Sequence, residues 1–169
     1  MKKLSDLVGN DITIVQPSVF KRIHEFWVEG ERYATMKFPR LFSSQADVQL
    51  SDQQWEFYRP SIWRNDVEVR QRGNQMPIAK YAGRKWKQGG TIELPKGDRL
   101  IHQEKMWTNA NVITAESGIP LVSFKRKGFF GTAVLVTLHE KSEILDRYPW
   151  AIMLVWYVLL QQRRDAATH

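Results

Sequence analysis

The chain has 169 residues, of which 43% are hydrophobic and 25% are charged, a composition that argues against wholesale disorder. It contains no cysteine, which excludes a disulfide scaffold, Cys-ligated zinc, iron–sulfur clusters and thiol catalysis. Its 25 Lys and Arg residues exceed its 18 Asp and Glu residues, and the resulting net charge of +7 favours anionic partners. We expect one domain over residues 1–169, located in the cytoplasm and peripheral to a membrane.

Short runs rich in β-branched and aromatic residues, separated by turn residues, fill the chain before residue 140. Between Asp66 and Arg70 apolar and charged residues alternate, which predicts one buried and one solvent-facing side. The runs 119–124 and 133–138 are more uniformly apolar and are expected to be covered on both faces. The twelve expected strands are 12–16, 20–28, 32–38, 47–50, 54–59, 67–72, 77–82, 90–94, 99–105, 111–116, 120–125 and 132–139.

An internal repeat relates two parts of this strand-rich region at an offset of 44 residues, or 43 after a one-residue gap. Each copy holds four expected strands, an even number. Equivalent loops of an up-and-down sheet would therefore emerge at the same end. The matched positions are Trp63, Val67, Pro77, Ile78 and Tyr81 in the first copy, and Trp107, Asn111, Pro120, Leu121 and Phe124 in the second.

One helix is expected near the C-terminus, at about 149–163. The run Trp150–Leu160 is apolar without interruption, Pro149 suits a first helical turn, and Arg163 suits the negative end of the helix dipole. Because the helix is apolar on every side, it must be buried in protein or in lipid. Its length of about 22 Å is shorter than the roughly 30 Å of bilayer hydrocarbon, which favours a core helix over a tail anchor. We expect no transmembrane span.

A closed antiparallel barrel of about twelve strands would enclose such a helix and would leave no free sheet edge. In this pattern the chain resembles the tubby C-terminal domain superfamily, which includes the plant LURP-one-related proteins, the phospholipid scramblases and small bacterial relatives. The resemblance covers nearly the whole chain. It rests on Tyr33–Phe38, the strand units around Trp63 and Trp107, the segment Ala115–Leu121, and the run Trp150–Leu160.

This resemblance implies a twelve-stranded barrel around a central helix, in a family whose better-known members bind phosphoinositides or move lipids. No ligand residue can be transferred, because no binding motif matches residue by residue. The Cys-rich, Pro-rich and acidic calcium-binding segments of the scramblases have no counterpart in this sequence.

The sequence offers no positive evidence for an enzyme. The four histidines are not paired at metal-ligand spacing, no Gly-x-Ser-x-Gly elbow is present, and Gly89-Gly90-Thr91 lacks the spacing of a phosphate-binding loop. His24 and His102 are expected at the surface or rim. We therefore expect no catalytic residues, no metal site and no cofactor.

Two segments combine cations with aromatic residues, and both join the third and fourth strands of their repeat. We expect them to share one rim of the barrel and to bind an anionic ligand. Basic residues outnumber acidic ones by eight to two between Arg59 and Lys87, although a solvated basic face explains that bias equally well. The candidate ligand-binding residues are Arg84, Lys85, Trp86, Lys87, Lys125, Arg126, Lys127 and Phe129.

Cations beside exposed rings suit an anionic phospholipid surface, and they also suit single-stranded nucleic acid. The aromatic residues could instead point into the core, with the cations only keeping the loops soluble. The leading hypothesis is a non-enzymatic binding module for an anionic phospholipid surface. The alternatives are a structural or protein-interaction domain and, less favoured, a nucleic-acid-binding protein.

Overall fold

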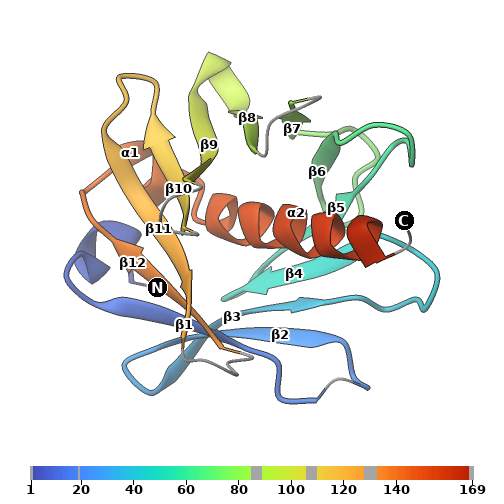
Figure 1. The fold of residues 1–169 in the computed structure, drawn as a ribbon, viewed down its shortest axis with the longest axis horizontal. Coiled ribbons are helices and arrows are strands. Elements are labelled where there is room, and N and C mark those ends of the chain that lie inside the picture. Colours follow the sequence, from blue (N-terminus) through green and yellow to red (C-terminus); the bar gives the residue numbers. More distant parts are fainter. Residues whose placement is uncertain (1, 19, 85–88, 106–109, 128–132, 168–169) are drawn as a thin grey trace.

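Twelve antiparallel strands form a closed barrel, in which each strand pairs with its neighbour in sequence and β1 pairs with β12 (Figure 1). The computed structural model describes residues 2–18, 20–84, 89–105, 110–127 and 133–167. The strands are β1 (Asp11–Val15), β2 (Ile23–Val28), β3 (Glu31–Lys37), β4 (Ala46–Leu50), β5 (Gln53–Tyr58), β6 (Val67–Gln71), β7 (Ala79–Gly83), β8 (Gly89–Glu93), β9 (Arg99–Lys105), β10 (Ala110–Ala115), β11 (Pro120–Arg126) and β12 (Val134–Leu138).

Each of the twelve expected strands overlaps a strand of the barrel, because alternating residues along each one face the interior. In β6, Val67 and Val69 are buried and the charged residues between and beyond them are half-buried, as the alternation predicts. The expectation of two covered faces is confirmed for β11, where four consecutive residues are buried. It is wrong for β12, whose Leu135 and Thr137 are half-buried on the outer face.

The starts of two strands differ from the prediction for local reasons. β2 begins at Ile23 instead of Phe20, since Phe20 is exposed and Arg22 adopts a left-handed backbone conformation with φ of 50°. β7 begins at Ala79 instead of Pro77, and proline cannot donate a hydrogen bond to a neighbouring strand.

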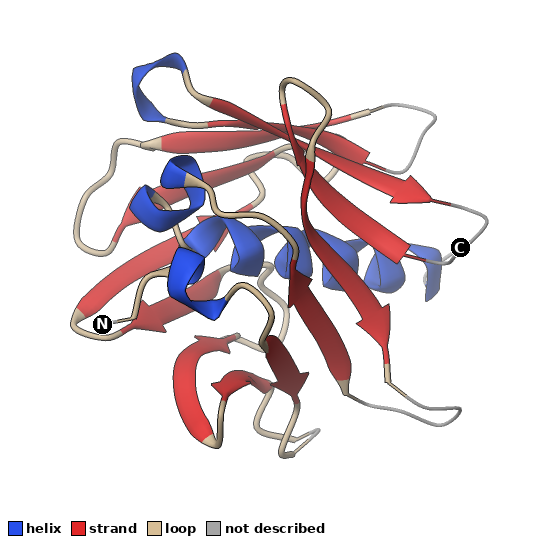
Figure 2. Ribbon diagram, turned by 90° about the vertical axis from the view of Figure 1, so that its left-hand side faces the viewer, coloured by secondary structure: helices blue, strands red, loops and turns tan. Residues whose placement is uncertain are grey.

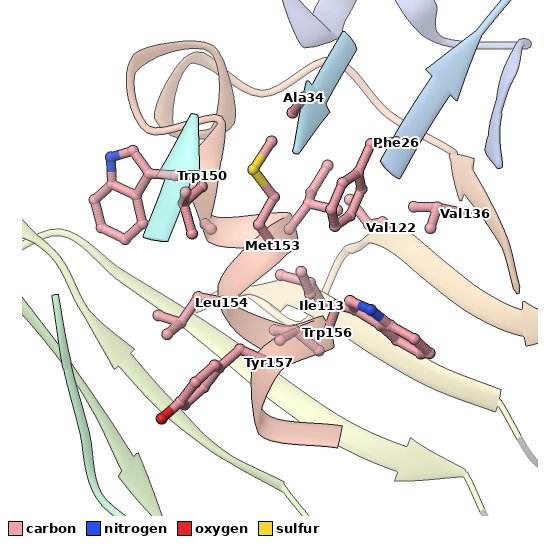
Figure 3. Packing of buried hydrophobic residues seen from close by; sticks show 14 of the residues in the cluster. Phe26, Ala34, Ile113, Val122, Val136, Trp150, Met153, Leu154, Trp156 and Tyr157 are labelled. Atoms are coloured by element: carbon pink, nitrogen blue, oxygen red, sulfur yellow. The ribbon is translucent and has the colours of Figure 1, made fainter. Parts of the chain in front are cut away.

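Helix α2 (Trp150–Ala167) passes through the barrel, and all of its residues from Trp150 to Leu159 are buried. Figure 3 shows its side chains leaving the helix in several directions. The helix extends four residues beyond the prediction. No proline or glycine follows residue 163, and Arg59 Nη1 binds Asp165 Oδ1 at 3.0 Å. No helix in the described part of the chain is both long enough and apolar enough to cross a membrane.

Short helices close the end at which α2 enters the barrel. They are η1 (Leu4–Leu7) and α1 (Glu143–Arg147), which the sequence analysis missed. The backbone amide of Ser5 donates to Asp146 Oδ1 at 2.8 Å, and the Ser5 hydroxyl donates to Asp146 Oδ2. Arg147 pairs with Asp98, which follows the 3₁₀ turn η2 (Pro95–Gly97) between β8 and β9.

The two ends of the barrel differ. We call the end closed by η1 and α1 the entry end, and the opposite end, where α2 ends, the exit end. Figure 2 shows the short helices and the N-terminus on one side of the molecule and the end of α2 on the other. Because the strands alternate in direction, β1, β3, β5, β7, β9 and β11 all end at the exit end.

Shortening a side chain at the middle of α2 should destabilise the whole barrel. Leu154 is 0% exposed, so Leu154→Ala should lower the free energy of unfolding by about 2–5 kcal/mol. The control Ile119→Ala changes a residue that is 52% exposed and should cost less than about 0.5 kcal/mol. Urea denaturation measures both, and equal effects would contradict the central role of the helix.

Candidate functional site

A cleft of about 670 Å³ opens at the exit end, between the last turns of α2 and the ends of β9 to β12. We call it the β11 cleft. Its walls are Glu104, Asn111, Phe124, Lys125, Arg126, Val134, Trp156, Leu159, Gln162, Arg163 and Ala166. α2 turns polar after Leu160, and of its last residues Gln162, Arg163 and Ala166 line this cleft.

The β11 cleft is electropositive. Lys125, Arg126 and Arg163 line it together with one carboxylate, that of Glu104. The pKa of Arg163 is lowered by burial and, second, by the charge of Arg126. The guanidinium of Arg163 lies 5.3 Å from the centre of the Trp156 ring, which holds it over an aromatic face. In the described chain, no acidic residue forms an ion pair with Arg126 or Arg163.

A buried chain of hydrogen bonds leads from the barrel interior to this cleft. Asn111 Oδ1 accepts from His102 Nε2 at 2.8 Å, so His102 Nδ1 is left to accept from the Tyr81 hydroxyl at 2.8 Å. The expectation that His102 lies at the surface or rim is wrong: the side chain is 0% exposed, and burial lowers its pKa. Its buried polar atoms are satisfied by Tyr81 and Asn111, which lie 21 and 9 residues away in sequence.

Two glycines make room for this chain. A Cβ at Gly90 would lie 2.8 Å from the Tyr81 ring, and a Cβ at Gly89 would lie 2.5 Å from the His102 carbonyl oxygen. Gly89 also has φ of 131°, a conformation that side chains disfavour. The Gly-Gly pair therefore serves close packing of the barrel.

His24 is buried as well, at 6% exposure, so its predicted rim position is also wrong. Trp156 Nε1 donates to His24 Nδ1 at 3.3 Å. An indole nitrogen can only donate, so this nitrogen of His24 carries no proton. Burial, followed by the charge of Arg163, lowers the pKa of His24 to about 4. The imidazole is thus neutral near pH 7 and holds the exit half of α2 against β2.

The structure places the described candidate residues at one end of the barrel. Lys125 and Arg126 line the β11 cleft. Arg84 and Lys127 are exposed at the same end, just beyond β7 and β11, but they do not line the cleft. The remaining candidates, Lys85, Trp86, Lys87 and Phe129, lie outside the described residues, as do Trp107 and Phe130.

The basic segment from Arg59 to Lys87 is partly neutralised. Arg70 pairs with Glu56 at 2.8 Å and Lys80 pairs with Asp66 at 3.6 Å, while Arg59 pairs with Asp165 of α2. The pairs of Arg70 and Lys80 favour the solvated-face interpretation for these two residues.

The sequence analysis missed the contribution of α2 to the cleft. It treated Arg163 as a helix-end cation and Trp156 as a core residue only. The direction of the chain was a usable signal: a helix that enters the barrel where β12 ends must leave it where β11 ends. That places the last turns of α2 beside Lys125 and Arg126.

Exposed apolar side chains also gather at the exit end. They stand on the three successive connections β1–β2, β3–β4 and β5–β6. Exposed apolar residues occur at the entry end too, at Met76 and Ile119, so exposure alone does not distinguish the two ends. The exit-end residues are Phe20, Leu41, Phe42, Ile62 and Trp63, which are 95%, 65%, 89%, 76% and 89% exposed.

No group of side chains in the described residues could hold a metal ion. No family model matches the sequence, and no curated protein matches it. The fold is similar to the X-ray structure of a protein from Arabidopsis thaliana, with a TM-score of 0.59 and 14% identity over 92% of this chain and 91% of that chain. At this identity the similarity shows a shared fold.

The neutral state of His24 should make stability depend on pH. Unfolded His24 binds a proton below about pH 6.5, whereas the folded residue does so only near pH 4, so stability is lost as pH falls through this window. Between pH 7 and pH 5 the loss from His24 should be about 1–2 kcal/mol. Chemical denaturation of His24→Gln should show a shallower fall over this range, and an unchanged fall would contradict the neutral assignment.

Proposed function

We propose that the protein is a member of the tubby-like superfamily and a non-enzymatic binding module for anionic phospholipid surfaces, acting at the cytoplasmic face of a membrane. The proposal rests on the side chains at the exit end of the barrel. Within the described residues, this end combines two cations that form no ion pair, Arg126 and Arg163, with exposed apolar side chains on three neighbouring connections. The structural similarity to the plant protein supports the fold part of this proposal.

The two kinds of side chain have complementary tasks at a membrane. Lys and Arg near an anionic surface contribute on the order of 1 kcal/mol each, an effect that fades within a Debye length. Aromatic and aliphatic side chains such as Phe42 and Trp63 gain further free energy by entering the interfacial layer. Because both kinds stand at one end, a single orientation of the barrel would engage them together.

The observations favour a lipid surface over single-stranded nucleic acid. Bases stack on aromatic rings, yet the exposed apolar set includes the aliphatic residues Leu41 and Ile62. Aliphatic side chains gain more from an acyl boundary than from a base. A structural or protein-interaction role is the remaining alternative, and the absence of vesicle binding would favour it.

Charge reversal at and beside the β11 cleft should weaken binding to anionic vesicles. The double variant Arg126→Glu, Lys127→Glu should lower the partition coefficient on phosphatidylserine-containing vesicles by about tenfold or more. The double variant Lys96→Glu, Arg99→Glu makes the same charge change at exposed sites of the entry end and should have little effect. Co-sedimentation with vesicles measures both. Equal losses would remove the exit end as the binding face.

Removing exposed apolar groups from the exit end should also weaken binding, without loss of stability. Phe42 and Trp63 are each 89% exposed, so Phe42→Ser with Trp63→Ser should leave the unfolding midpoint nearly unchanged. Vesicle affinity should fall by about tenfold, because two rings no longer enter the interface. The matched control at the entry end is Met76→Ser with Ile119→Ser. If the control lowers vesicle affinity as much, the barrel does not bind by its exit end.

A further inference from the structure

One arginine side chain joins the end of α2 to the connection between β5 and β6. Arg59 directly follows β5, and its side chain is 8% exposed. Arg59 Nη1 donates to Asp165 Oδ1, in the last turns of α2, at 3.0 Å. Arg59 Nη2 donates to the carbonyl oxygens of Ile62 and Arg64, each at 3.4 Å. The guanidinium therefore ties a loop at the exit end to a helix 106 residues further along the chain.

The Arg59 guanidinium restrains its three acceptors together. Arginine keeps its charge in proteins, so burying its side chain is costly unless its N–H groups are paired. Asp165 supplies a carboxylate for this pairing, and the loop supplies two carbonyl groups. The donors of a guanidinium point in fixed directions within one plane, whereas the ammonium of lysine is a compact point charge. Lysine in place of Arg59 would therefore keep the charge but would not hold helix and loop in the same geometry.

Two further contacts restrict the same connection. Ser61 Oγ accepts a hydrogen bond from the Trp63 amide at 3.2 Å, which closes a short turn within the loop. A Cβ at Gly83 would lie 2.6 Å from both the Cβ and the carbonyl oxygen of Asn65, so the loop packs directly on the end of β7. Together with Arg59, these contacts hold the connection from residue 59 to residue 65.

The restrained connection presents two large apolar side chains to solvent. Ile62 is 76% exposed and Trp63 is 89% exposed. The carbonyl groups that Arg59 binds belong to Ile62 and Arg64, the residues on either side of Trp63 in the sequence. Apolar side chains on a freely moving loop gain free energy by folding back onto the protein surface. A backbone held on both sides of Trp63 opposes such a movement and keeps both side chains outward.

The neighbouring β3–β4 connection is also tied to α2. The Tyr157 hydroxyl donates to the carbonyl oxygen of Ser44 at 2.7 Å. The same connection carries Leu41 and Phe42, which are 65% and 89% exposed. One helix thus holds two connections that carry exposed apolar side chains, so these side chains keep a fixed arrangement relative to each other.

We infer that Arg59 is a positioning residue for the binding face at the exit end. Held by Asp165, it keeps Ile62 and Trp63 in their outward arrangement before the protein meets its ligand surface. Such preorganisation raises affinity, because the entropy of ordering the loop is lost on folding and not on binding. The inference rests on the proposed lipid-binding function and adds to it the residue pair that prepares this face for binding.

The test uses Arg59→Lys, which keeps the net charge and removes the planar fork. Its matched control is Arg147→Lys, which makes the same change in the ion pair with Asp98 at the entry end. Asp165→Asn is a second variant, which breaks the ion pair from the helix side. Hydrogen exchange of the peptide that covers residues 59–66 measures the restraint on the connection. Co-sedimentation with phosphatidylserine-containing vesicles measures binding by the unchanged protein, Arg59→Lys and Arg147→Lys.

Arg59→Lys should speed hydrogen exchange in residues 59–66 by at least about tenfold and lower vesicle affinity by about fivefold. Asp165→Asn should speed the same exchange, while Arg147→Lys should leave exchange and affinity within about twofold of the unchanged protein. In a background with Ile62→Ser and Trp63→Ser, Arg59→Lys should change vesicle affinity by less than about twofold, because the side chains to be positioned are absent. A merely structural role would lower affinity equally in both backgrounds and would overturn the inference.

The remaining outcomes separate this inference from the proposed function. Vesicle binding by the unchanged protein, with unchanged exchange in Arg59→Lys and Asp165→Asn, would overturn the positioning role and leave the lipid function intact. Faster exchange in Arg59→Lys without loss of vesicle affinity would do the same. If the unchanged protein does not bind vesicles, the lipid function is rejected, whereas faster exchange in the two variants would still support the positioning of the loop by Arg59.

Discussion

The burial of a helix that is apolar on every side determines the architecture. From Trp150 to Leu159 no side chain of α2 can face water without loss of hydrophobic free energy, and no single sheet face covers more than one side of a helix. The helix must therefore be surrounded by protein on all sides. A sheet that closes on itself surrounds it, and the pairing of β1 with β12 also removes the two edges that an open sheet would expose. The inward residues of twelve strands and the helix thus form one core.

The same helix makes the two ends of the barrel chemically different. At the entry end, η1 and α1 cover the core, and their polar groups pair locally through Ser5 and Asp146. At the exit end, α2 becomes polar at Gln161. The strand ends there lie beside Gln and Arg side chains of the helix instead of apolar ones. Cations are favoured at a helix C-terminus, which is consistent with Arg163 and Arg164 at this end. Clefts open beside the last turns of α2 at this end.

Local patterns were sufficient to predict the strands and α2, because alternation with period 2 and an unbroken apolar run are visible in the sequence itself. The short helices η1 and α1 were missed, since four or five residues carry too little periodicity. The burial of His24 and His102 depends on partners, Trp156 and Tyr81, that only the closed barrel brings within hydrogen-bond distance. A cleft at the exit end that Arg22, Arg40 and Arg164 line was missed for the same reason, because these residues come together only when α2 passes the start of β2.

Some features that oppose stability lie at the exit end, although left-handed residues occur at both ends. Arg22 has a left-handed backbone, and within the described residues its buried Nε and the buried Oε1 of Gln161 have no hydrogen-bond partner. At the entry end, by contrast, Arg147 has Asp98 as a partner. Exposed apolar residues occur at both ends, and among the described residues each end also has arginines that form no ion pair, such as Arg72 at the entry end and Arg126 at the exit end. At the exit end these side chains surround clefts that open beside the last turns of α2, which supports the proposed binding function there.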